Sequence, residues 1–316
     1  MQGSPPDRSN AASASLLAAV ALTGLIALAL LTAGSPPAHA AAARTKILFD
    51  RKVHEPNDYN VLSMRPNGSH KHALTHNPND DWGASASPNG KHIVFVSPRD
   101  PDGNNEIFIM RANGSHGRQL THTGSTAYNE FPSFAPNGRR IVFDSNRDGD
   151  GEIFSMRLNG THQRQLTHND ALDYAPVVSP NGRKFAFQSD RDGDQEIFIM
   201  KRNGTHQRQL THNNDYDELP AYFPNGRRIV FDRNHGGDAD DEIFRMRANG
   251  SHQHQITHNN ADDDSASVSP NGRKIAFDSD RDGDDEIFSM KANGRHQRQL
   301  THNNVVDEFP HWARLR

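Results

Sequence analysis

Cysteine is absent from the 316-residue sequence. The chain therefore has no disulfide framework, no thiol nucleophile and no cysteine for lipid attachment. Hydrophobic residues are also few, at 33% of the chain, and aromatic residues make up 7%. Such fractions are low for a globular domain but are typical of many short, half-buried strands joined by polar turns. The fold must be held together by its own core.

An excess of charge of either sign is missing too. The formal net charge is −4, whereas a nucleic-acid-binding protein usually presents a strongly basic face. The sequence thus predicts no nucleic-acid partner. Enzyme signatures are likewise missing, because the chain has no Gly-x-Ser-x-Gly, no His-Glu-x-x-His and no phosphate-binding loop. We therefore expect no catalysis, although motifs alone leave this open.

A long hydrophobic run occurs once, at residues 16–33, and Ala38-His39-Ala40 follows it. The run and the Ala-x-Ala motif predict a signal peptide over residues 1–40, cleaved after Ala40, and a short linker at 41–45. The mature protein would then be periplasmic or secreted, without stable membrane insertion. Because this apolar run of 18 residues approaches the length that spans a bilayer, an uncleaved anchor is the alternative.

One pattern recurs from residue 46 to the C-terminus. Its clearest copy, Ser269–His302, reads as a Pro-Asn-Gly turn, a strand at 274–278, an acidic turn, a strand at 286–290, an Asn-Gly turn and a last strand at 297–301. Pro, Gly, Asn and Asp supply the fixed or positive φ that tight reversals need. The Leu/Ile-Thr-His triplet that closes each copy ends at His76, His122, His168, His212, His258 and His302. Repeats of this length indicate a propeller or a solenoid.

The strand count decides between these two architectures. The Pro-Asn-Gly turn that follows an inner strand occurs at Pro88, Pro136, Pro180, Pro224 and Pro270. It therefore has one copy fewer than the closing triplet. The chain begins with three strands from Lys46 and ends with a lone first strand at Asp307–Ala313. Together they complete a further blade and remove both free sheet edges. We expect an all-β, six-bladed β-propeller over residues 46–316, with four-stranded blades and one composite blade of one C-terminal and three N-terminal strands, as a monomer.

The repeat resembles a known family. Ser-Pro-Asn-Gly-Arg-Lys, Ile-Ala-Phe-Asp-Ser-Asp-Arg-Asp-Gly, Glu-Ile-Phe-Ser-Met and Gln-Leu-Thr, as they stand at residues 269–301, look like the repeat of TolB-type β-propellers of the Tol–Pal envelope system. The resemblance covers residues 46–313. It implies a non-catalytic scaffold of the cell envelope that binds a protein or peptide over its channel face. The alternative is a polysaccharide-acting or metal-assisted propeller enzyme that uses channel-mouth carboxylates, with His311, Tyr174 or Tyr222 nearby.

Acidic residues recur where each inner strand begins. The inner strands of a propeller line its channel, so this position predicts a ring of carboxylates at one channel mouth. Such a ring would attract a basic partner segment or a cation. The alternative is that the aspartates cap the local turn. The predicted mouth residues are Asp81, Glu130, Asp173, Asp217, Glu218, Asp263, Asp307 and Glu308.

The acidic turns could also bind calcium. Asp278, Asp280 and Asp282 have the Asp-x-Asp-x-Asp-Gly spacing of a Ca²⁺ loop, and Glu286 stands at a later ligand position. Asp144 and Asp148 belong to a similar copy, which includes Asn146 and Glu152. Strands flank both turns, so a helical calcium hand is excluded. The alternative is an ordinary hairpin turn without a metal.

Overall fold

The computed structural model describes residues 44–316 with the exception of 55–57, 125 and 235–239. The predicted signal peptide, its cleavage site after Ala40 and residues 41–43 lie outside this part of the chain. Arg44 and Thr45, expected in the linker, belong to the first strand. No helix in the described part is long and apolar enough to span a membrane.

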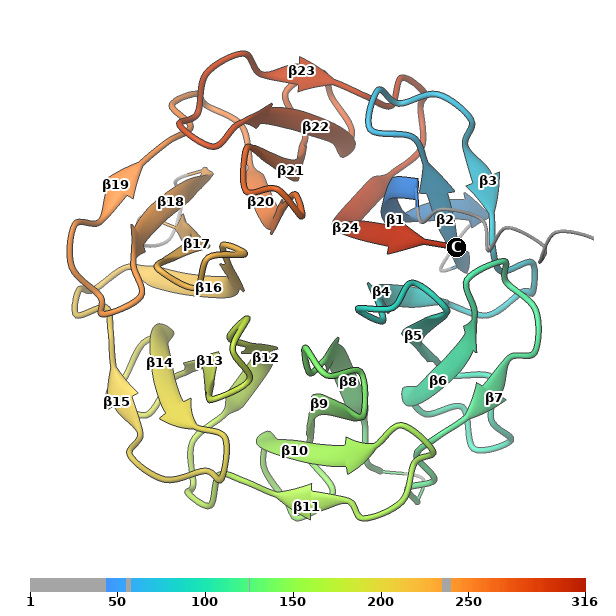
Figure 1. The fold of residues 1–316 in the computed structure, drawn as a ribbon, viewed down its shortest axis with the longest axis vertical. Helices are drawn as coiled ribbons and strands as arrows, with labels where there is room; N and C mark the ends of the chain where they lie inside the picture. Colours follow the sequence, from blue (N-terminus) through green and yellow to red (C-terminus); the bar gives the residue numbers. More distant parts are fainter. Residues whose placement is uncertain (1–43, 55–57, 125, 235–239) are drawn as a thin grey trace, which may run out of the picture. The chain divides into compact units, whose positions relative to one another are not determined.

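The described residues form 24 strands in six four-stranded antiparallel sheets that surround a common centre (Figure 1). Each sheet is one blade, and its strands run in order from the channel to the rim. We number the blades from the composite one, which contains β1, so that blades 2 to 6 follow in chain order. The predicted six-bladed propeller is therefore confirmed.

The strand bounds repeat closely from blade to blade. The inner strands are β24 (Asp307–Leu315), β4 (Trp82–Ala86), β8 (Asn129–Phe134), β12 (Asp173–Val178), β16 (Tyr216–Tyr222) and β20 (Asp263–Val268). The second strands are β1 (Arg44–His54), β5 (His92–Ser97), β9 (Arg140–Ser145), β13 (Lys184–Ser189), β17 (Arg228–Asn234) and β21 (Lys274–Ser279). The third strands are β2 (Asp58–Met64), β6 (Glu106–Arg111), β10 (Glu152–Arg157), β14 (Glu196–Lys201), β18 (Asp241–Arg247) and β22 (Glu286–Lys291). The outer strands are β3 (His72–Ala73), β7 (Arg118–Gln119), β11 (Arg164–Gln165), β15 (Arg208–Gln209), β19 (His254–Gln255) and β23 (Arg298–Gln299).

Blade 1 closes the ring as the strand count predicts. Its inner strand β24 comes from the C-terminus and pairs antiparallel with β1, with Ile47 opposite Trp312 and Arg44 opposite Leu315. The sheet order is β24-β1-β2-β3, so the first three strands of the chain and its last strand share one sheet. In Figure 1 the red β24 lies against the blue β1.

The core lies between neighbouring blades. Second and third strands are covered on both faces, which explains why they read as continuous apolar runs. Between blades 1 and 2, Leu48 and Leu315 pack with Ile93 and Phe95, and all four are buried. The Phe95 ring also lies 5.8 Å from that of Phe108, and an equivalent pair recurs in blades 3 to 6. Burying each such large side chain stabilises the fold by about 1.5–3 kcal/mol.

The Asn-Gly turn between third and outer strands brings each blade against the preceding one. Gly204 in blade 4 has a φ of +88°, and a Cβ there would lie 2.1 Å from the backbone oxygen of Leu166 in blade 3. Turn glycines of other blades approach their neighbours in the same way. The neighbouring backbone thus leaves room for glycine alone, which explains why Asn-Gly recurs with the repeat.

We expect Gly204→Ala to lower the free energy of unfolding by roughly 2–5 kcal/mol, because a backbone cost of about 1–2 kcal/mol adds to an overpacking cost of about 1–3 kcal/mol. Gly193 is the matched control: its φ is +116°, but no atom lies within 4 Å of its added Cβ. Gly193→Ala should cost only the backbone part. Urea denaturation compares the two, and equal losses would contradict the close approach.

The alternating strand directions place the turns on two faces. One face carries the starts of the inner strands and the turns between second and third strands, such as Asp280–Asp285. We term it the acidic face. The other carries the Pro-Asn-Gly turns, such as Pro270–Gly272, and the Asn-Gly turns after the third strands. We term it the basic face.

Candidate functional site at the channel mouth

Each blade junction on the acidic face contains a buried polar network. Between blades 6 and 1, Asn303 Nδ2 donates to Glu286 Oε1 at 2.9 Å and to Asp307 Oδ2 at 3.0 Å. Arg51 Nε donates to Asp307 Oδ1 at 2.6 Å, and its guanidinium carbon lies 5.5 Å from the ring centroid of Phe49. The network therefore ties β22 of one blade to β24 and β1 of the next.

The equivalent aspartates of other blades are held in the same way. They are fully buried, and their ion pairs are Arg99–Asp81, Arg191–Asp173, Arg233–Asp217 and Arg281–Asp263. Blade 3 has Asn129 here, which accepts a hydrogen bond from Arg147. The structure thus corrects the predicted placement of Asp81, Asp173, Asp217, Asp263 and Asp307: they lie inside the blades, each beside a guanidinium, and not exposed at the channel mouth.

The three predicted glutamates, Glu130, Glu218 and Glu308, do lie beside the opening and are half-buried. Each directly precedes a cavity-lining residue with a positive φ, as Glu308 precedes Phe309 with a φ of 51°. The strand pairing is irregular at this point. Such a bulge changes which way neighbouring side chains face, so the aspartate enters the blade while the glutamate stays near the channel. Asp264 occupies the glutamate position in blade 6.

Acidic residues gather on one side of the mouth, over blades 5, 6 and 1. Burial, together with repulsion from nearby carboxylates, raises the pKa of Glu218 and Glu308 to about 7 and that of Asp241 and Asp285 to about 6. Asp241 and Asp285 stand just before the third-strand glutamate and were not predicted. The repeated Asp-Glu-Ile-Phe in blades 5 and 6 was the available signal. A cation placed here would relieve this repulsion.

Aromatic residues take the equivalent positions on the other side. Trp82 replaces the glutamate in blade 2, and its ring centroid lies 5.3 Å from that of Phe131 and 5.9 Å from that of Phe309. Tyr174 replaces it in blade 4. The mouth is therefore asymmetric: an acidic wall over blades 5, 6 and 1 faces a side on which the aromatic residues of blades 2 and 4 flank Glu130 of blade 3.

A second row of carboxylates lies deeper, on the second strands. Its members are fully buried or nearly so, and they are Asp50, Asp144, Asp232 and Asp278. Ala175 in the next blade donates its backbone N–H to Asp144 Oδ1 at 3.1 Å. Burial raises the pKa of all four carboxyls well above the usual range. This placement corrects the calcium prediction for Asp144 and Asp278, which lie at blade interfaces rather than in the acidic turns.

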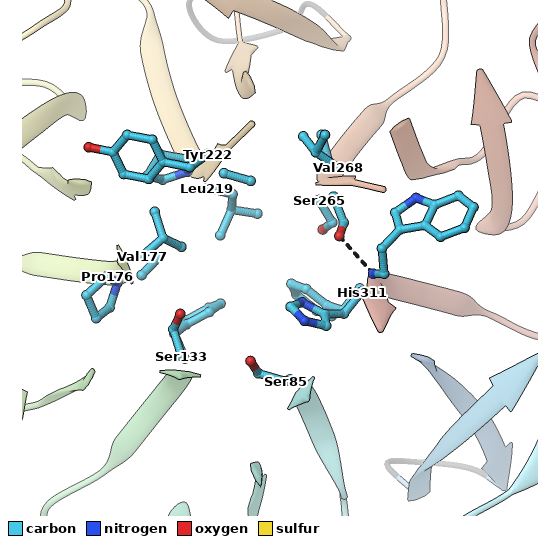
Figure 2. Close-up of a pocket in the computed structure, with 18 of the residues that line it drawn as sticks. Ser85, Ser133, Pro176, Val177, Leu219, Tyr222, Ser265, Val268 and His311 are labelled. Atoms are coloured by element: carbon cyan, nitrogen blue, oxygen red, sulfur yellow. Dashed lines mark hydrogen bonds between the residues drawn. The ribbon is translucent and has the colours of Figure 1, made fainter. Parts of the chain in front are cut away.

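Behind the mouth, the inner strands enclose a cavity of about 280 Å³. Its walls are mainly apolar and include Pro176, Leu219 and Val268. Figure 2 shows His311 reaching into this space from β24, with Ser85 below it in that view. Burial lowers the pKa of His311 to about 4, so its ring is neutral near pH 7. The cavity offers apolar surface and a neutral imidazole.

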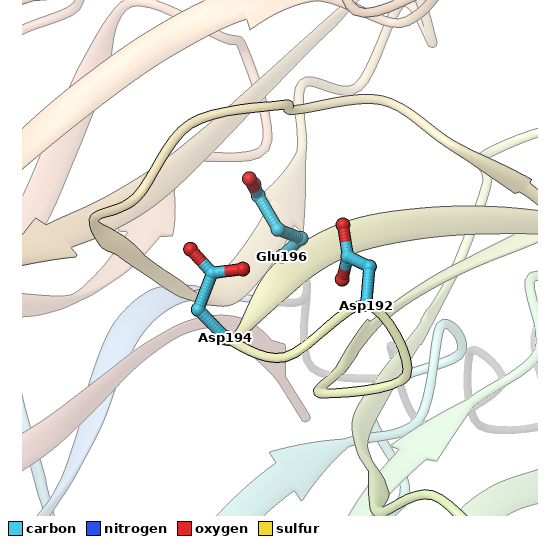
Figure 3. Close-up of side chains that lie close together, drawn as sticks. All are labelled: Asp192, Asp194 and Glu196. Carbon is cyan, nitrogen blue, oxygen red and sulfur yellow. The ribbon is translucent and has the colours of Figure 1, made fainter.

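Two acidic turns bring three carboxylates together. Asp282, Asp284 and Glu286 each offer an oxygen within 4.8 Å of the others, and Asp192, Asp194 and Glu196 do the same (Figure 3). The predicted ligands Asp282 and Glu286 therefore meet, but Asp284 joins them in place of Asp280. Asp280 instead accepts a backbone hydrogen bond from Asp262. In the equivalent turn of blade 3, Asp148 accepts a hydrogen bond from Gln165, as Asp282 does from Gln299.

The stability of the protein should fall as pH rises through neutrality. The folded-state pKa of Glu218 and Glu308 is about 7, against an ordinary value of 4.5. The folded protein thus holds more protons than the unfolded chain between these values. Their stabilising contribution is full below pH 4.5 and is lost as pH rises through 7. The glutamates of three junction networks, Glu152, Glu196 and Glu286, have the same raised pKa of about 7 and act in the same direction.

We therefore expect a lower Tm at pH 8.5 than at pH 6.5 in scanning calorimetry. Each kcal/mol lost should lower Tm by roughly 2–4 °C in a protein of this size. The double variant Glu218→Gln, Glu308→Gln should show a smaller drop, since the junction glutamates still titrate. A Tm that rises over this range, or a double variant with the full drop, would show that these carboxyls do not titrate as described.

Comparisons with known proteins agree with this architecture. The family model of the TolB β-propeller domain matches residues 75–238 and 126–316. Among solved structures, TolB from Acinetobacter baumannii has a TM-score of 0.74 and 19% identity, over 85% of this chain and 66% of that one. A putative TolB from Agrobacterium tumefaciens has a TM-score of 0.52 and 21% identity, over 69% of this chain and 90% of that one.

Hydrazine synthase from Kuenenia stuttgartiensis is also similar, with a TM-score of 0.71 and 12% identity over 86% of this chain and 47% of that one. At such identities these likenesses show the fold alone. A comparison with curated protein sequences gives no match. The family model, however, covers more than half of the sequence, and the matched residues contain the repeated turns, strands and junction networks of the blades. The chain therefore belongs to the TolB β-propeller domain family.

Proposed function

We propose that this protein is a non-catalytic scaffold of the cell envelope, periplasmic or secreted, that binds a basic segment of a partner protein over its channel mouth. The observation that carries the proposal is the asymmetry of the mouth. Glu218, Asp264 and Glu308 stand on one side and Trp82 on the other. A lysine or arginine side chain fits this arrangement, since its charge suits the carboxylates and its stem suits the aromatic rings.

The raised pKa values support a cationic ligand in particular. Near pH 7 the carboxyls of Glu218 and Glu308 are partly protonated, because burial and, after it, the like charges around them raise the pKa of both groups to about 7. A bound ammonium or guanidinium group would favour the ionised form, so binding would release protons. Affinity for a basic segment should therefore increase between pH 6 and pH 8. Binding driven by apolar contacts alone would lack this dependence.

The test is recovery of a partner from an envelope extract by the immobilised protein, followed by mass spectrometry. The variant Glu218→Gln, Asp264→Asn, Glu308→Gln should retain at least tenfold less of the partner. Arg139→Gln on the basic face is the control and should retain it fully. If the triple variant recovers the same proteins in the same amounts, the channel mouth is not the binding site.

One observation favours the alternative, a polysaccharide-acting enzyme. A carboxyl with a pKa of about 7, as at Glu218 and Glu308, suits a general acid at neutral pH. Incubation with envelope polysaccharides and a reducing-end assay tests this reading. Turnover that is lost in Glu308→Gln would replace the scaffold proposal, whereas partner binding without turnover would support it.

We also propose that the turns with three clustered carboxylates bind Ca²⁺. Calcium takes six to eight oxygen ligands, so water or backbone oxygens would have to complete the shell around Asp282, Asp284 and Glu286. The hard, anionic oxygens are of the type that calcium prefers. Relief of repulsion among them would stabilise the folded protein when the ion binds.

Millimolar Ca²⁺ should therefore raise Tm, corresponding to about 2.7 kcal/mol at a hundredfold excess over Kd. The variant Asp192→Asn, Asp194→Asn, Asp282→Asn, Asp284→Asn should lose the increase. The control is Asp100→Asn, Asp102→Asn in blade 2, whose turn has Asn104 in place of the middle aspartate. Calorimetry without a calcium response would identify these turns as ordinary hairpins.

A further inference from the structure

Acidic and basic side chains are segregated between the two faces of the propeller. Every aspartate and glutamate in the described part of the chain lies on the acidic face or next to it, in its turns and at the adjoining strand ends. The bases of that face are Lys52 and the arginines of the junction networks. All other lysines and arginines of the described residues belong to the basic face or to the rim beside it. The small net charge conceals this separation.

The repeat sets the basic residues in two concentric rings. Turns after the inner strands contribute an inner ring, with Lys91, Arg139, Arg183, Arg227 and Arg273 as its exposed members. The ends of the third strands contribute an outer ring, with Arg65, Arg111, Arg157, Lys201, Arg247 and Lys291, all exposed. The described chain places no carboxylate side chain on this face, so the two rings meet no opposing side-chain charge there. The face thus carries a positive field of one sign.

The residues exposed on this face suit an anionic partner that needs no aromatic or apolar binding site. The exposed large apolar residues among the described ones are Val53, Tyr216 and Val305. All three lie towards the acidic face, Val53 and Tyr216 at strand ends and Val305 in the segment before β24. The basic face thus offers no exposed aromatic platform of the kind on which single-stranded nucleic acid stacks. A lipid bilayer with anionic headgroups presents many phosphates in one plane, and clustered lysines and arginines bind such a surface without a shaped pocket.

The position of the first propeller strand also bears on a membrane partner. Arg44, the first described residue, lies at the basic-face end of β1, opposite Leu315. In the sequence, residues 34–43 alone separate it from the apolar run 16–33. Ten residues reach at most about 36 Å when extended. If this run stays uncleaved as an anchor, the chain length between it and Arg44 limits how far the basic-face end of β1 can lie from the bilayer.

We propose that the basic face docks on an anionic membrane surface by contacts of its two rings with lipid phosphates. The acidic face would then be turned away from the membrane, with its channel mouth open to a partner. This proposal does not depend on the partner proposed above, because it concerns the opposite face.

The test uses residues 44–316, which contain every strand of the ring, so the apolar run contributes nothing. Co-sedimentation is measured with vesicles of phosphatidylcholine alone and of phosphatidylcholine with 30% phosphatidylglycerol, in 50 mM and 500 mM NaCl. We expect binding only to the anionic vesicles, and release at high salt, because screening shortens the range of surface charges. Inorganic phosphate at millimolar concentration should not compete, since single phosphates lack the planar array.

The variant Arg139→Gln, Arg183→Gln, Arg227→Gln, Arg273→Gln should bind the anionic vesicles at least tenfold less tightly. The matched control is His76→Glu, His122→Glu, His168→Glu, His212→Glu, which shifts the net charge equally but alters exposed residues of the acidic face; it should bind as the unaltered protein does. Equal binding to neutral vesicles, or an equal loss in both variants, would overturn the proposal. Tighter binding to a 20-base-pair duplex than to anionic vesicles at 150 mM salt would overturn it in favour of nucleic acid.

Discussion

Deletion of Asp307–Arg316 should leave a protein that does not fold stably. The segment supplies the inner strand of blade 1 and buries Trp312, Ala313 and Leu315. Its apolar burial contributes on the order of 5–10 kcal/mol, which is comparable to the whole stability of a typical domain. Loss of the strand also exposes the edge of β1. Circular dichroism and thermal denaturation of the truncated protein should show no cooperative transition.

A circular permutant provides the control. Residues 307–316 are moved in front of Arg44 through a Pro-Asn-Gly turn, so that blade 1 becomes continuous like the other blades. This protein keeps the same strand and should melt cooperatively near the Tm of the original. If the truncated protein has an unchanged Tm, β24 does not close the ring.

The second large effect is expected at a buried ion pair. Arg233 donates to both carboxylate oxygens of Asp217, at 2.5 Å and 2.8 Å. The guanidinium carbon also lies 4.6 Å from the ring centroid of Phe244. Asp217→Ala would remove the carboxylate that both nitrogens contact and leave Asp215, 4.0 Å from Arg233 Nε, as the nearest negative charge. Breaking a buried pair in this way costs about 3–5 kcal/mol. Urea denaturation measures the loss.

The propeller itself contains the matched control. At the equivalent position in blade 3, Asn129 accepts a hydrogen bond from Arg147. Asp217→Asn should therefore keep an acceptor for Arg233 and cost clearly less than Asp217→Ala. Equal losses for the two substitutions would show that the aspartate does not act through this pair.

The fold could be predicted from the sequence because its signals are local and repeated. Each Pro-Asn-Gly and Asn-Gly turn marks a reversal, and the missing Pro-Asn-Gly copy identifies the blade that is shared by both ends. The strand limits were less certain. The strands extend beyond their apolar residues, because Arg44 in β1 pairs with Leu315 in β24. Such an extension depends on the partner strand and cannot be read from one strand alone.

Side-chain direction at the mouth could not be predicted in the same way. The sequence placed aspartate and glutamate next to each other where each inner strand begins, as at Asp307 and Glu308. A positive φ at the following residue, Phe309, makes the first side chain enter the blade and leaves the second near the channel. Glycine would have indicated a positive φ at this position, but only blade 2 has a glycine there, at Gly83. The other blades have other residue types, so the sequence did not predict the bend.

The carboxylates that meet in the acidic turns differ in part from the predicted calcium ligands for a similar reason. Spacing along the chain suggested that Asp278, Asp280 and Asp282 converge. Asp278 is the last but one residue of β21 and faces a blade interface, whereas Asp282 lies beyond the turn and meets Asp284. Net charge was also a poor guide, since a value near zero gave no sign of a basic face opposite an acidic one. The convergence of the carboxylates and the separation of charge between the two faces both depend on where the strands reverse direction in three dimensions.

Site-specific photo-crosslinking in the cell tests whether the acidic wall at the channel mouth forms a partner-binding site. A photoreactive phenylalanine derivative replaces Tyr174 at the channel mouth or Arg183 on the basic face. We expect a discrete crosslinked protein from the Tyr174 position and none of that mass from the Arg183 position. The product should be lost when Glu218→Gln, Asp264→Asn and Glu308→Gln are added. A crosslink at Tyr174 that persists in this variant, or the absence of any protein product at the mouth, would contradict a binding site formed by the acidic wall.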